Sequence, residues 1–339
     1  MASIFESARH ARALAAAVDA FAVAPLLRAG LRLGLADALR TPQEPQALAE
    51  RLGLESDLVL AWARMLHAQG WLSRRGETYE LAGPFQWLLD APEAASAAAL
   101  LEQVVDTLGP QLAALPELMK GAERPLFGDR EQALRMAAIM RLFEPRALRA
   151  LTKIPGVRHP RRILDIGCGQ GHYLADLLTR FRDALGVGIE LDPHVAEAAR
   201  RRLAEADVTR RAEIRVGDFL HAEPPPGRFD LILLNHNLHY FSPAQRVAVL
   251  RRAHDLLDER GIVVVQTLVR IEGLLPSLLG LQGPAALFDL ALRTHRNLYG
   301  LPAVDELHAA LREAGCAQTG EVPILAGGAV RFVWGSDGA

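Results

Sequence analysis

The chain has 339 residues, of which 50% are hydrophobic and 23% are charged, with 38 basic against 40 acidic side chains. These proportions are those of a folded globular protein of about two domains, and they exclude wholesale disorder, a collagen-like fibre and a coiled-coil rod. The near balance of charge argues against a general polyanion binder, because nucleic-acid-binding domains carry a basic surplus.

Cysteine usage and hydrophobic runs bear on the compartment. The sequence contains two cysteines, Cys168 and Cys316, too few for a disulfide framework or a thiolate metal site, so we expect a reducing compartment and the cytoplasm. The longest uncharged run, 273–288, is too short to span a bilayer. Charged residues interrupt the N-terminal segment, which excludes a signal peptide: Glu6, Arg9, Arg12 and Asp19. We expect no membrane segment.

The first structural signal lies between about residues 21 and 89, where three helical patterns precede two short strands. Residues 58–69 follow helical spacing after Ser56 and Asp57. Residues 71–74 and 78–81 are expected to form a hairpin. This order is a winged-helix arrangement, and we interpret residues 1–105 as a winged-helix-like domain.

A winged helix raises the possibility of DNA binding. The helix that would enter the groove carries Glu55 and Asp57 against Arg64 alone, so it would approach phosphates with the wrong charge. We therefore favour a structural or dimer-forming role with no nucleic-acid partner. A ligand-sensing regulator that uses this domain on DNA is the alternative.

Residues 106–155 are expected to form connecting helices, broken near Gly109-Pro110, Gly121 and Pro125. Met136, Met140 and Arg141 lie just ahead of the next domain. Because methionine adapts to irregular shapes, we assign these three residues to an acceptor pocket, with plain helix packing as the alternative.

From residue 156 to 339 strands alternate with helices, which predicts a doubly wound α/β sheet. Helices are expected over 173–181, 193–206, 243–257 and 302–314. Strands are expected over 162–166, 185–190, 212–216, 229–234, 262–268, 317–324 and 330–334.

The strongest local signal is Asp165-Ile166-Gly167-Cys168-Gly169-Gln170-Gly171, a buried strand followed by a glycine-rich turn. A dinucleotide site requires G-x-G-x-x-G, whereas this spacing is G-x-G-x-G with an acid two positions before it. That carboxylate would repel a pyrophosphate, but it suits a ligand with a positive amino group.

This segment resembles motif I of the class I S-adenosylmethionine-dependent methyltransferases. The resemblance implies a Rossmann-like sheet with an antiparallel last strand, and S-adenosylmethionine as cofactor. By the same resemblance, Asp165 and the three glycines hold the methionine end, together with Asn235. Glu190 holds the ribose, with Asp192 as the competing residue, whereas Asp218 recognises the adenine amino group and Phe219 packs on the ring. For Asp192 and Asp218 a helix N-cap is the structural alternative.

The whole layout is similar to the small-molecule O-methyltransferases that dimerise through an N-terminal helical domain. This likeness implies a homodimer and an aromatic or polyketide-like small-molecule acceptor, as in natural product biosynthesis. His239, in His239-Tyr240-Phe241-Ser242, matches the family's catalytic histidine. A neutral imidazole is available near pH 7 to remove a phenolic proton, so His239 is the candidate general base.

Two departures keep the acceptor open. Gln266 stands where the family places the acid that orients the histidine, and Leu301 lies where a second acid is expected. We therefore favour a hydroxyl oxygen as the methylated atom and keep nitrogen and carbon as alternatives. A cofactor-binding enzyme that no longer methylates is a further alternative.

The remaining candidates surround an apolar segment at 270–300, which we interpret as a lid or wall over the acceptor, or else as core helices. His236, Asp289 and Arg293 are assigned to substrate binding. His236 and His239 with Asp289 offer too few convergent ligands for a metal site, so we expect no metal.

Overall fold

The computed structural model describes residues 2–128, 130–157, 159–271, 282–325 and 327–338. Its internal contacts divide the chain into two compact units. The N-terminal unit comprises Met1–Pro116 and Asp129–Leu142, and the C-terminal unit comprises Glu117–Gly128 and Phe143–Ala339. The segment expected to connect two domains, 106–155, is thus shared between the units.

The N-terminal unit is mainly helical. Its small sheet pairs β1 with β2 in antiparallel register, Leu72 opposite Leu81, so the predicted hairpin is confirmed. Trp62, Leu66 and Phe85 are buried at its centre. Its elements are α1 (Ala2–Arg32), α2 (Leu35–Ala38), α3 (Pro45–Leu52), α4 (Ser56–Ala68), β1 (Leu72–Arg75), β2 (Thr78–Leu81), α5 (Gly83–Asp90), α6 (Ala94–Glu102), a π-helix (Gln103–Leu108), α7 (Gly109–Ala113), α8 (Leu115–Met119), which runs past Pro116, and α9 (Arg130–Met140).

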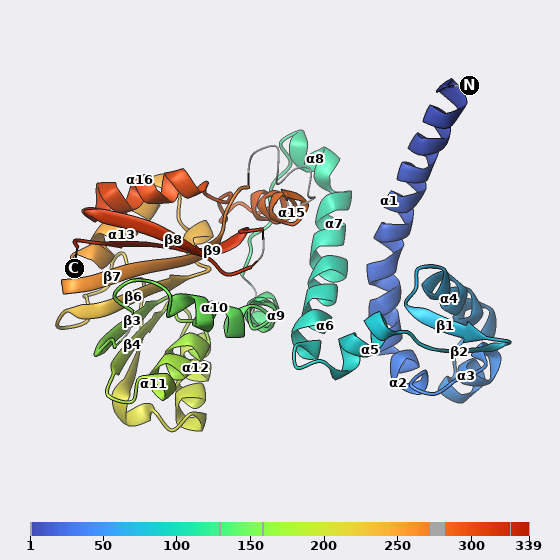
Figure 1. Cartoon of the computed structure of the whole chain (residues 1–339), viewed down its shortest axis with the longest axis horizontal. Coiled ribbons are helices and arrows are strands. Elements are labelled where there is room, and N and C mark those ends of the chain that lie inside the picture. Colours follow the sequence, from blue (N-terminus) through green and yellow to red (C-terminus); the bar gives the residue numbers. More distant parts are fainter. Residues whose placement is uncertain (1, 129, 158, 272–281, 326, 339) are drawn as a thin grey trace. The chain divides into compact units, whose positions relative to one another are not determined.

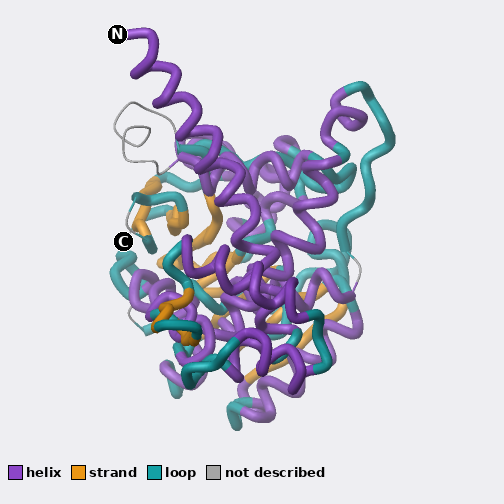
Figure 2. The backbone as a smooth tube through the Cα atoms, turned by 90° about the vertical axis from the view of Figure 1, so that its right-hand side faces the viewer, coloured by secondary structure: helices purple, strands orange, loops and turns teal. Residues whose placement is uncertain are grey.

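Helix α1 runs without interruption through Pro25 (Figure 2). By length and composition alone its stretch Ser7–Arg32 is long and apolar enough to cross a membrane, with a mean hydropathy of 1.6, and little of it is buried. This finding runs against the expectation of no membrane segment. That expectation was based on the longest run of uncharged residues being too short to span a bilayer, whereas α1 is apolar on average although it contains charged residues. An apolar helix left uncovered in one chain fits a membrane or another protein surface equally well.

The C-terminal unit is built on a seven-stranded sheet in the order β5-β4-β3-β6-β7-β9-β8. Strand β9 runs antiparallel to both its neighbours, whereas β5, β4, β3, β6 and β7 are parallel. The predicted doubly wound sheet with an antiparallel last strand is confirmed. The strands are β3 (Arg162–Ile166), β4 (Leu185–Glu190), β5 (Ala212–Val216), β6 (Phe229–Asn235), β7 (Leu257–Leu268), β8 (Gln318–Pro323) and β9 (Val330–Ser336).

Helices cover both faces of this sheet (Figure 1). On one face α10 (Glu144–Leu151), α11 (His172–Arg180) and α12 (Pro193–Glu205) share a core with Ile163 and Val264. On the other, α13 (Pro243–His254) and α16 (Val304–Ala314) pack on Leu164 and Val265. Neighbouring residues of a strand point to opposite faces, so strands covered on both sides must be apolar almost throughout. In the described parts of the connections lie the further helices η2 (Thr209–Arg211), η3 (Leu238–Tyr240) and α15 (Gln282–Arg293).

The order of strands places the candidate site. Strand β3 lies between β4 and β6, so the chain leaves it toward one side first and returns on the other. Ligands of such sheets bind at this switch point, outside the carboxyl ends of the strands. The segments that follow β3, β4, β5 and β6 therefore meet at one edge.

Candidate functional site

The turn after β3 depends on its glycines. Gly167, Gly169 and Gly171 have φ angles of +66°, +54° and +75°, which residues with a Cβ rarely adopt. A Cβ on Gly167 would also lie 2.7 Å from Nδ2 of Asn237. The turn thus presents its backbone to the carboxyl edge of the sheet, immediately before the positive end of α11.

Glu190, at the end of β4, joins the segments that follow three strands. Its Oε2 accepts a hydrogen bond from the N–H of Gly169 at 2.9 Å, and its Oε1 accepts one from the N–H of Asp192 at 3.1 Å. Its main-chain oxygen accepts from the N–H of Gly217 at 2.9 Å. The glycine turn, the end of β4 and the segment before Asp218 are therefore held side by side.

The two other acids at this edge are engaged locally. Asp192 caps α12, because its Oδ1 accepts from the N–H groups of His194 and Val195 at 2.7 and 3.2 Å. Asp218 accepts from the N–H of Leu220 at 2.9 Å and contacts Nδ1 of His221 at 2.7 Å. Burial raises the pKa of Asp218, but the hydrogen bonds from His221 and Leu220 outweigh it, so the pKa lies below its usual value. Asp218 is therefore an ionised carboxylate.

Phe219 is only 5% exposed and packs in the sheet core. The guanidinium of Arg252 lies over its ring at 5.4 Å. Its assignment to the purine ring remains a prediction.

Asp165 is buried in β3, 1% exposed. Its Oδ1 accepts a hydrogen bond from Nδ2 of Asn235 at 3.5 Å. Burial, and then the charge of Glu190, raise its pKa to about 8 despite the hydrogen bond from Asn235. Without a cation beside it, Asp165 is therefore mostly protonated and neutral at pH 7.

Two buried polar atoms at the end of β6 have no hydrogen-bond partner among the described residues, Oδ1 of Asn235 and Nε2 of His236. The buried Tyr173 hydroxyl and Gln266 amide lie next to each other and have no other partner there. Asn235 and Gln266 are opposite each other in the β6–β7 register. An unsatisfied buried polar group costs about 1–3 kcal/mol, so such a group in a native fold usually has a bound partner.

His239 lies in η3, just beyond β6. Its ring is 4.6 Å from that of Tyr240 and 6.1 Å, edge to face, from that of Phe288. Burial, and then the nearby His236 and Arg246, lower its pKa to about 3. The imidazole is consequently neutral at physiological pH.

Gln266 does not orient this imidazole, since no hydrogen bond joins the two described side chains. Val265 and Leu238 pack on the same face of the sheet. Because neighbouring residues of a strand point to opposite faces, the side chain of Gln266 lies on the other face, which α10 and α11 cover. The main-chain oxygen of His239 accepts a hydrogen bond from the N–H of Tyr299 at 2.7 Å, which ties the turn that carries the imidazole to the segment after α15.

The residues assigned to substrate binding are spread over the chain. His236 follows β6 with a φ of +53° and donates its N–H to the oxygen of Gln266 at 2.8 Å. Asp289 pairs with Nε of Arg293 at 2.8 Å and accepts from the N–H of Leu301 at 2.5 Å. The charges of Asp289 and Arg293 are therefore already paired with each other within the protein. Within the described ranges, no three side chains of His, Cys, Asp or Glu converge on one point.

The other three assigned residues, Met136, Met140 and Arg141, lie on α9 or directly after it, in the N-terminal unit. The first half of the predicted lid, residues 272–281, lies outside the described residues. The second half is helix α15, which presents Phe288 to His239.

Sequence reasoning missed Asn237 and Arg246. Asn237 donates to the oxygen of Ile166 and so ties the end of β6 to the glycine turn. Arg246 is 6% exposed and bonds to main-chain oxygens on both sides of His239. The signal was its spacing, because it lies on α13 in line with the buried Val249, Leu250 and Ala253.

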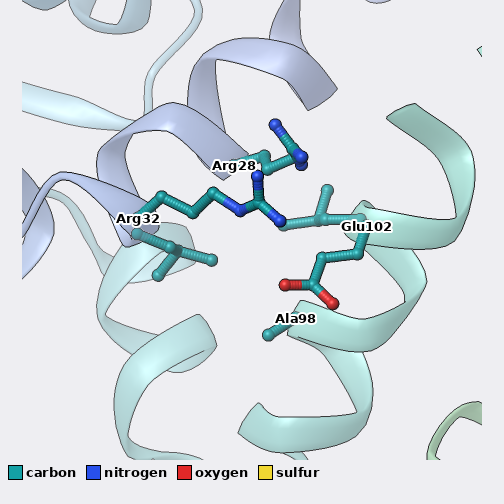
Figure 3. Close-up of a pocket in the computed structure, with 6 residues that line it drawn as sticks. Arg28, Arg32, Ala98 and Glu102 are labelled. Atoms are coloured by element: carbon teal, nitrogen blue, oxygen red, sulfur yellow. The ribbon is translucent and has the colours of Figure 1, made fainter. Parts of the chain in front are cut away.

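A separate cleft lies in the N-terminal unit between α1 and α6 (Figure 3). Arg28, Arg32 and Glu102 line it, and its volume is about 160 Å³, smaller than the usual ligand pocket. Arg28 is already paired with Asp106 at 2.5 Å. None of the predicted site residues lines this cleft.

Comparison with known proteins agrees with this geometry. Residues 163–261 match the family model described as a methyltransferase domain. The 3-hydroxy-5-methyl-1-naphthoate 3-O-methyltransferase of Streptomyces sahachiroi is 31% identical over 195 residues, which cover 56% of this chain and 52% of that protein. The chain thus spans about half the length of this relative.

Two further similarities bear on function and fold. Aclacinomycin 10-hydroxylase of Streptomyces purpurascens is 34% identical over 113 residues, 33% of this chain and 29% of that protein. The crystal structure of human N-acetylserotonin methyltransferase in complex with S-adenosylmethionine superposes with a TM-score of 0.76 at 17% identity, covering 97% of this chain and 98% of that chain. Residues 163–261 therefore match a methyltransferase domain, and the chain shares its fold with the human N-acetylserotonin methyltransferase structure.

Proposed function

We propose that the protein transfers a methyl group from S-adenosylmethionine to a hydroxyl of an aromatic or polyketide-like small molecule. The observation that carries this proposal is the position of Glu190, which joins the glycine turn, the end of β4 and the segment before Asp218. One elongated ligand with an amino-acid end, a sugar and a base would contact all three.

The residues fit this cofactor. Glu190 retains acceptor capacity for ribose hydroxyls, because a carboxylate offers about four lone-pair sites and two main-chain N–H groups use two of them. The unpaired Oδ1 of Asn235, beside Asp165, supports a positively charged amino group as its partner. Asp218 offers a carboxylate to the adenine amino group. When bound, S-adenosylmethionine supplies an electrophilic methyl group on a positively charged sulfur.

In this proposal His239 accepts the proton of the acceptor hydroxyl, so that the oxygen can attack. Its lowered pKa keeps the imidazole neutral at pH 7, so a ring nitrogen has a free lone pair, but the same shift makes the imidazole a weaker base than a free histidine. Tyr240 and Phe288 beside it exclude water from the reacting oxygen. His236 is the residue of the C-terminal unit next to this turn that we propose for acceptor binding, and Asp289 and Arg293 would have to exchange their mutual ion pair to take part. The assignment of Met136, Met140 and Arg141 to acceptor binding stays a prediction from the sequence.

A direct experiment measures cofactor binding and methyl transfer separately. Calorimetry with S-adenosylhomocysteine should give saturable binding to one site per chain. Incubation with methyl-labelled S-adenosylmethionine and a panel of hydroxynaphthoates and hydroxyphenazines should then give labelled ether products. Absence of binding at millimolar cofactor would overturn the proposal.

The second candidate is an enzyme that binds the cofactor without transferring its methyl group. Gln266 and Leu301 in place of two acids favour it, as does the similarity to a hydroxylase. Saturable cofactor binding with turnover of a panel compound, and no consumption of S-adenosylmethionine, would identify this activity. Products methylated on nitrogen or carbon would identify the remaining alternatives.

Cofactor binding should release a proton from Asp165. The unliganded carboxyl has a pKa of about 8, and an adjacent ammonium favours its ionised form. Affinity for S-adenosylhomocysteine should therefore rise with pH up to about 8. Calorimetry at pH 7 in buffers of different ionisation enthalpy measures the released proton.

The Asp165→Asn variant is the control for this measurement. It should bind without releasing the proton, and its affinity should no longer rise with pH. Without ligand, the folded protein holds the proton of Asp165 more tightly than the unfolded chain does. The resulting stabilisation is fully present below pH 3.8, the ordinary pKa of the carboxyl, and is lost as the pH rises through about 8. Equal proton release by both proteins would contradict this role for Asp165.

We also propose that the protein is a homodimer through its N-terminal domain, in the cytoplasm. Both cysteines are free and buried, which supports a reducing compartment. Leu14, Val18 and Phe21 are 69%, 61% and 73% exposed and recur at helical spacing along one stripe of α1. A second copy would cover this stripe.

Charged substitutions in this stripe should separate the dimer. Val18→Asp combined with Phe21→Asp should halve the mass in analytical ultracentrifugation, because an apolar contact is replaced by charge repulsion. Leu58→Asp, which changes a leucine of α4 that is 65% exposed, is the matched control and should leave the mass unchanged. Recovery of the unmodified protein in the membrane fraction would indicate that a bilayer covers α1 instead.

A further inference from the structure

We propose that Arg246 is a positioning residue that sets the orientation of His239, by holding the turn after β6 against the segment that follows α15. Nothing in the family match or in the sequence pattern assigns it a function. The inference rests on the proposed function only in taking His239 as the base.

The guanidinium of Arg246 bonds to main-chain oxygens on both sides of His239. Its single Nε–H is shared between the oxygens of Leu238 at 3.0 Å and Phe241 at 3.1 Å. These two residues bracket His239 and Tyr240, so the contacts define the start and the end of the turn. The arginine comes from α13, whose start is itself secured by a capping box of Ser242 and Gln245.

The same side chain reaches a distant segment. Its Nη2 donates to the oxygen of Gly300 at 2.7 Å, 54 positions along the chain. The neighbouring Tyr299 donates its N–H to the oxygen of His239 at 2.7 Å. The histidine is thus held between α13 and the 299–300 segment, and Arg246 contacts both.

The 299–302 segment is anchored on its outer side as well. Arg270 donates from Nη1 to the oxygen of Leu301 at 3.0 Å, and its N–H bonds to the oxygen of Pro302 at 3.0 Å. Asp289 accepts from the N–H of Leu301. With its far side secured, this segment provides a rigid support for His239 rather than a loose loop.

The contacts use two separated donor nitrogens, Nε toward Leu238 and Phe241 and Nη2 toward Gly300. Arginine spreads its donors over a planar guanidinium, whereas lysine carries its donors on one nitrogen, so we expect lysine to serve only one of the two segments. The charged groups around Arg246 are Arg270, Arg293, Asp289 and Glu306, and burial together with the two arginines lowers its pKa. Among the described residues its hydrogen bonds go to carbonyl oxygens, and removing them would leave a buried charge unpaired.

The matched control is Arg211, in the same unit at the opposite edge of the sheet. Its guanidinium also binds three main-chain oxygens, those of Phe181, Ala184 and Leu178, at 3.2, 3.0 and 2.8 Å. Arg246→Gln and Arg211→Gln therefore remove comparable contacts, but only the first lies beside His239. Arg246→Lys keeps the positive charge but lacks the planar guanidinium, so it tests the charge by itself.

Two measurements on the full chain decide the proposal. Hydrogen exchange of the Tyr299 amide should accelerate at least tenfold in Arg246→Gln and stay unchanged in Arg211→Gln. With a phenol that the unmodified enzyme methylates, kcat should fall about 10²-fold in Arg246→Gln with an unchanged KM for S-adenosylmethionine. Arg246→Lys should recover less than half of the lost activity.

The pH profile separates orientation from charge. Burial lowers the pKa of His239 most, and His236 and Arg246 lower it further. Loss of the arginine's charge should therefore move the acidic limb of kcat/KM to higher pH in the glutamine variant, and less in the lysine variant. An unchanged Tyr299 amide, or an equal loss of kcat in Arg211→Gln, would overturn the proposal. If the unmodified protein methylates no phenol, the proposed function fails, whereas the exchange data still decide what Arg246 holds.

Discussion

The His239→Ala variant is expected to lose about 10²- to 10⁴-fold in kcat for methyl transfer to a phenol, with cofactor affinity unchanged. The reason is that a phenol has a pKa near 10 and needs a base at neutral pH, and His239 is the neutral imidazole at the end of β6. Initial rates with labelled S-adenosylmethionine measure the loss, and calorimetry with S-adenosylhomocysteine measures affinity.

His254→Ala is the matched control, since this histidine ends α13 and pairs with Asp337 at 2.7 Å, away from η3. It should keep full activity. Because burial lowers the pKa of His239 to about 3, its protonation should not reduce the rate between about pH 5 and 8. A His239→Ala variant as active as the unmodified protein would point to an acceptor that is already ionised, and would remove this histidine from the mechanism.

The Glu190→Gln variant is expected to bind S-adenosylhomocysteine about 10- to 100-fold more weakly. Glu190 accepts from two main-chain N–H groups, those of Gly169 and Asp192, whereas glutamine must turn its own donor toward one of them. Loss of a hydrogen bond to a charged group costs about 1.5–3 kcal/mol, which corresponds to this range of affinity. Calorimetric titration gives the dissociation constant directly.

Asp192→Ala distinguishes the competing residue. As the N-cap of α12, Asp192 should contribute about 0.5–2 kcal/mol to stability and little to cofactor affinity. Thermal unfolding should therefore report its loss, while the titration stays close to that of the unmodified protein. The reverse pattern, with affinity lost in Asp192→Ala and kept in Glu190→Gln, would transfer the ribose role to Asp192.

Local sequence patterns predicted the elements well, because the C-terminal sheet is covered on both faces. A strand such as β6, with Leu231, Ile232, Leu233 and Leu234 in succession, has no exposed face and reads as an apolar run. The glycine turn was equally legible, since three left-handed positions in five residues require glycine. These features depend on neighbours in the chain.

The face of the sheet on which a given side chain lies was harder to predict from the sequence. Gln266 aligned with the acid that would orient the histidine, yet strand alternation places it on the face away from Leu238. The residue that does reach the histidine turn, Arg246, lies on a helix that the sequence marked only as amphipathic. Its acceptor Gly300 comes from a distant loop, and no local pattern connects them.

The sequence by itself determined the alternation of strands and helices, the glycine turn and the order of acids at successive strand ends, because each follows from short-range spacing and backbone sterics. Only the tertiary structure decided that Glu190 joins three segments, that burial raises the pKa of Asp165 to about 8, and that Arg246 bonds to the main chain on both sides of His239. These properties depend on strand register, desolvation and contacts between distant residues, and they exist only after the chain has folded.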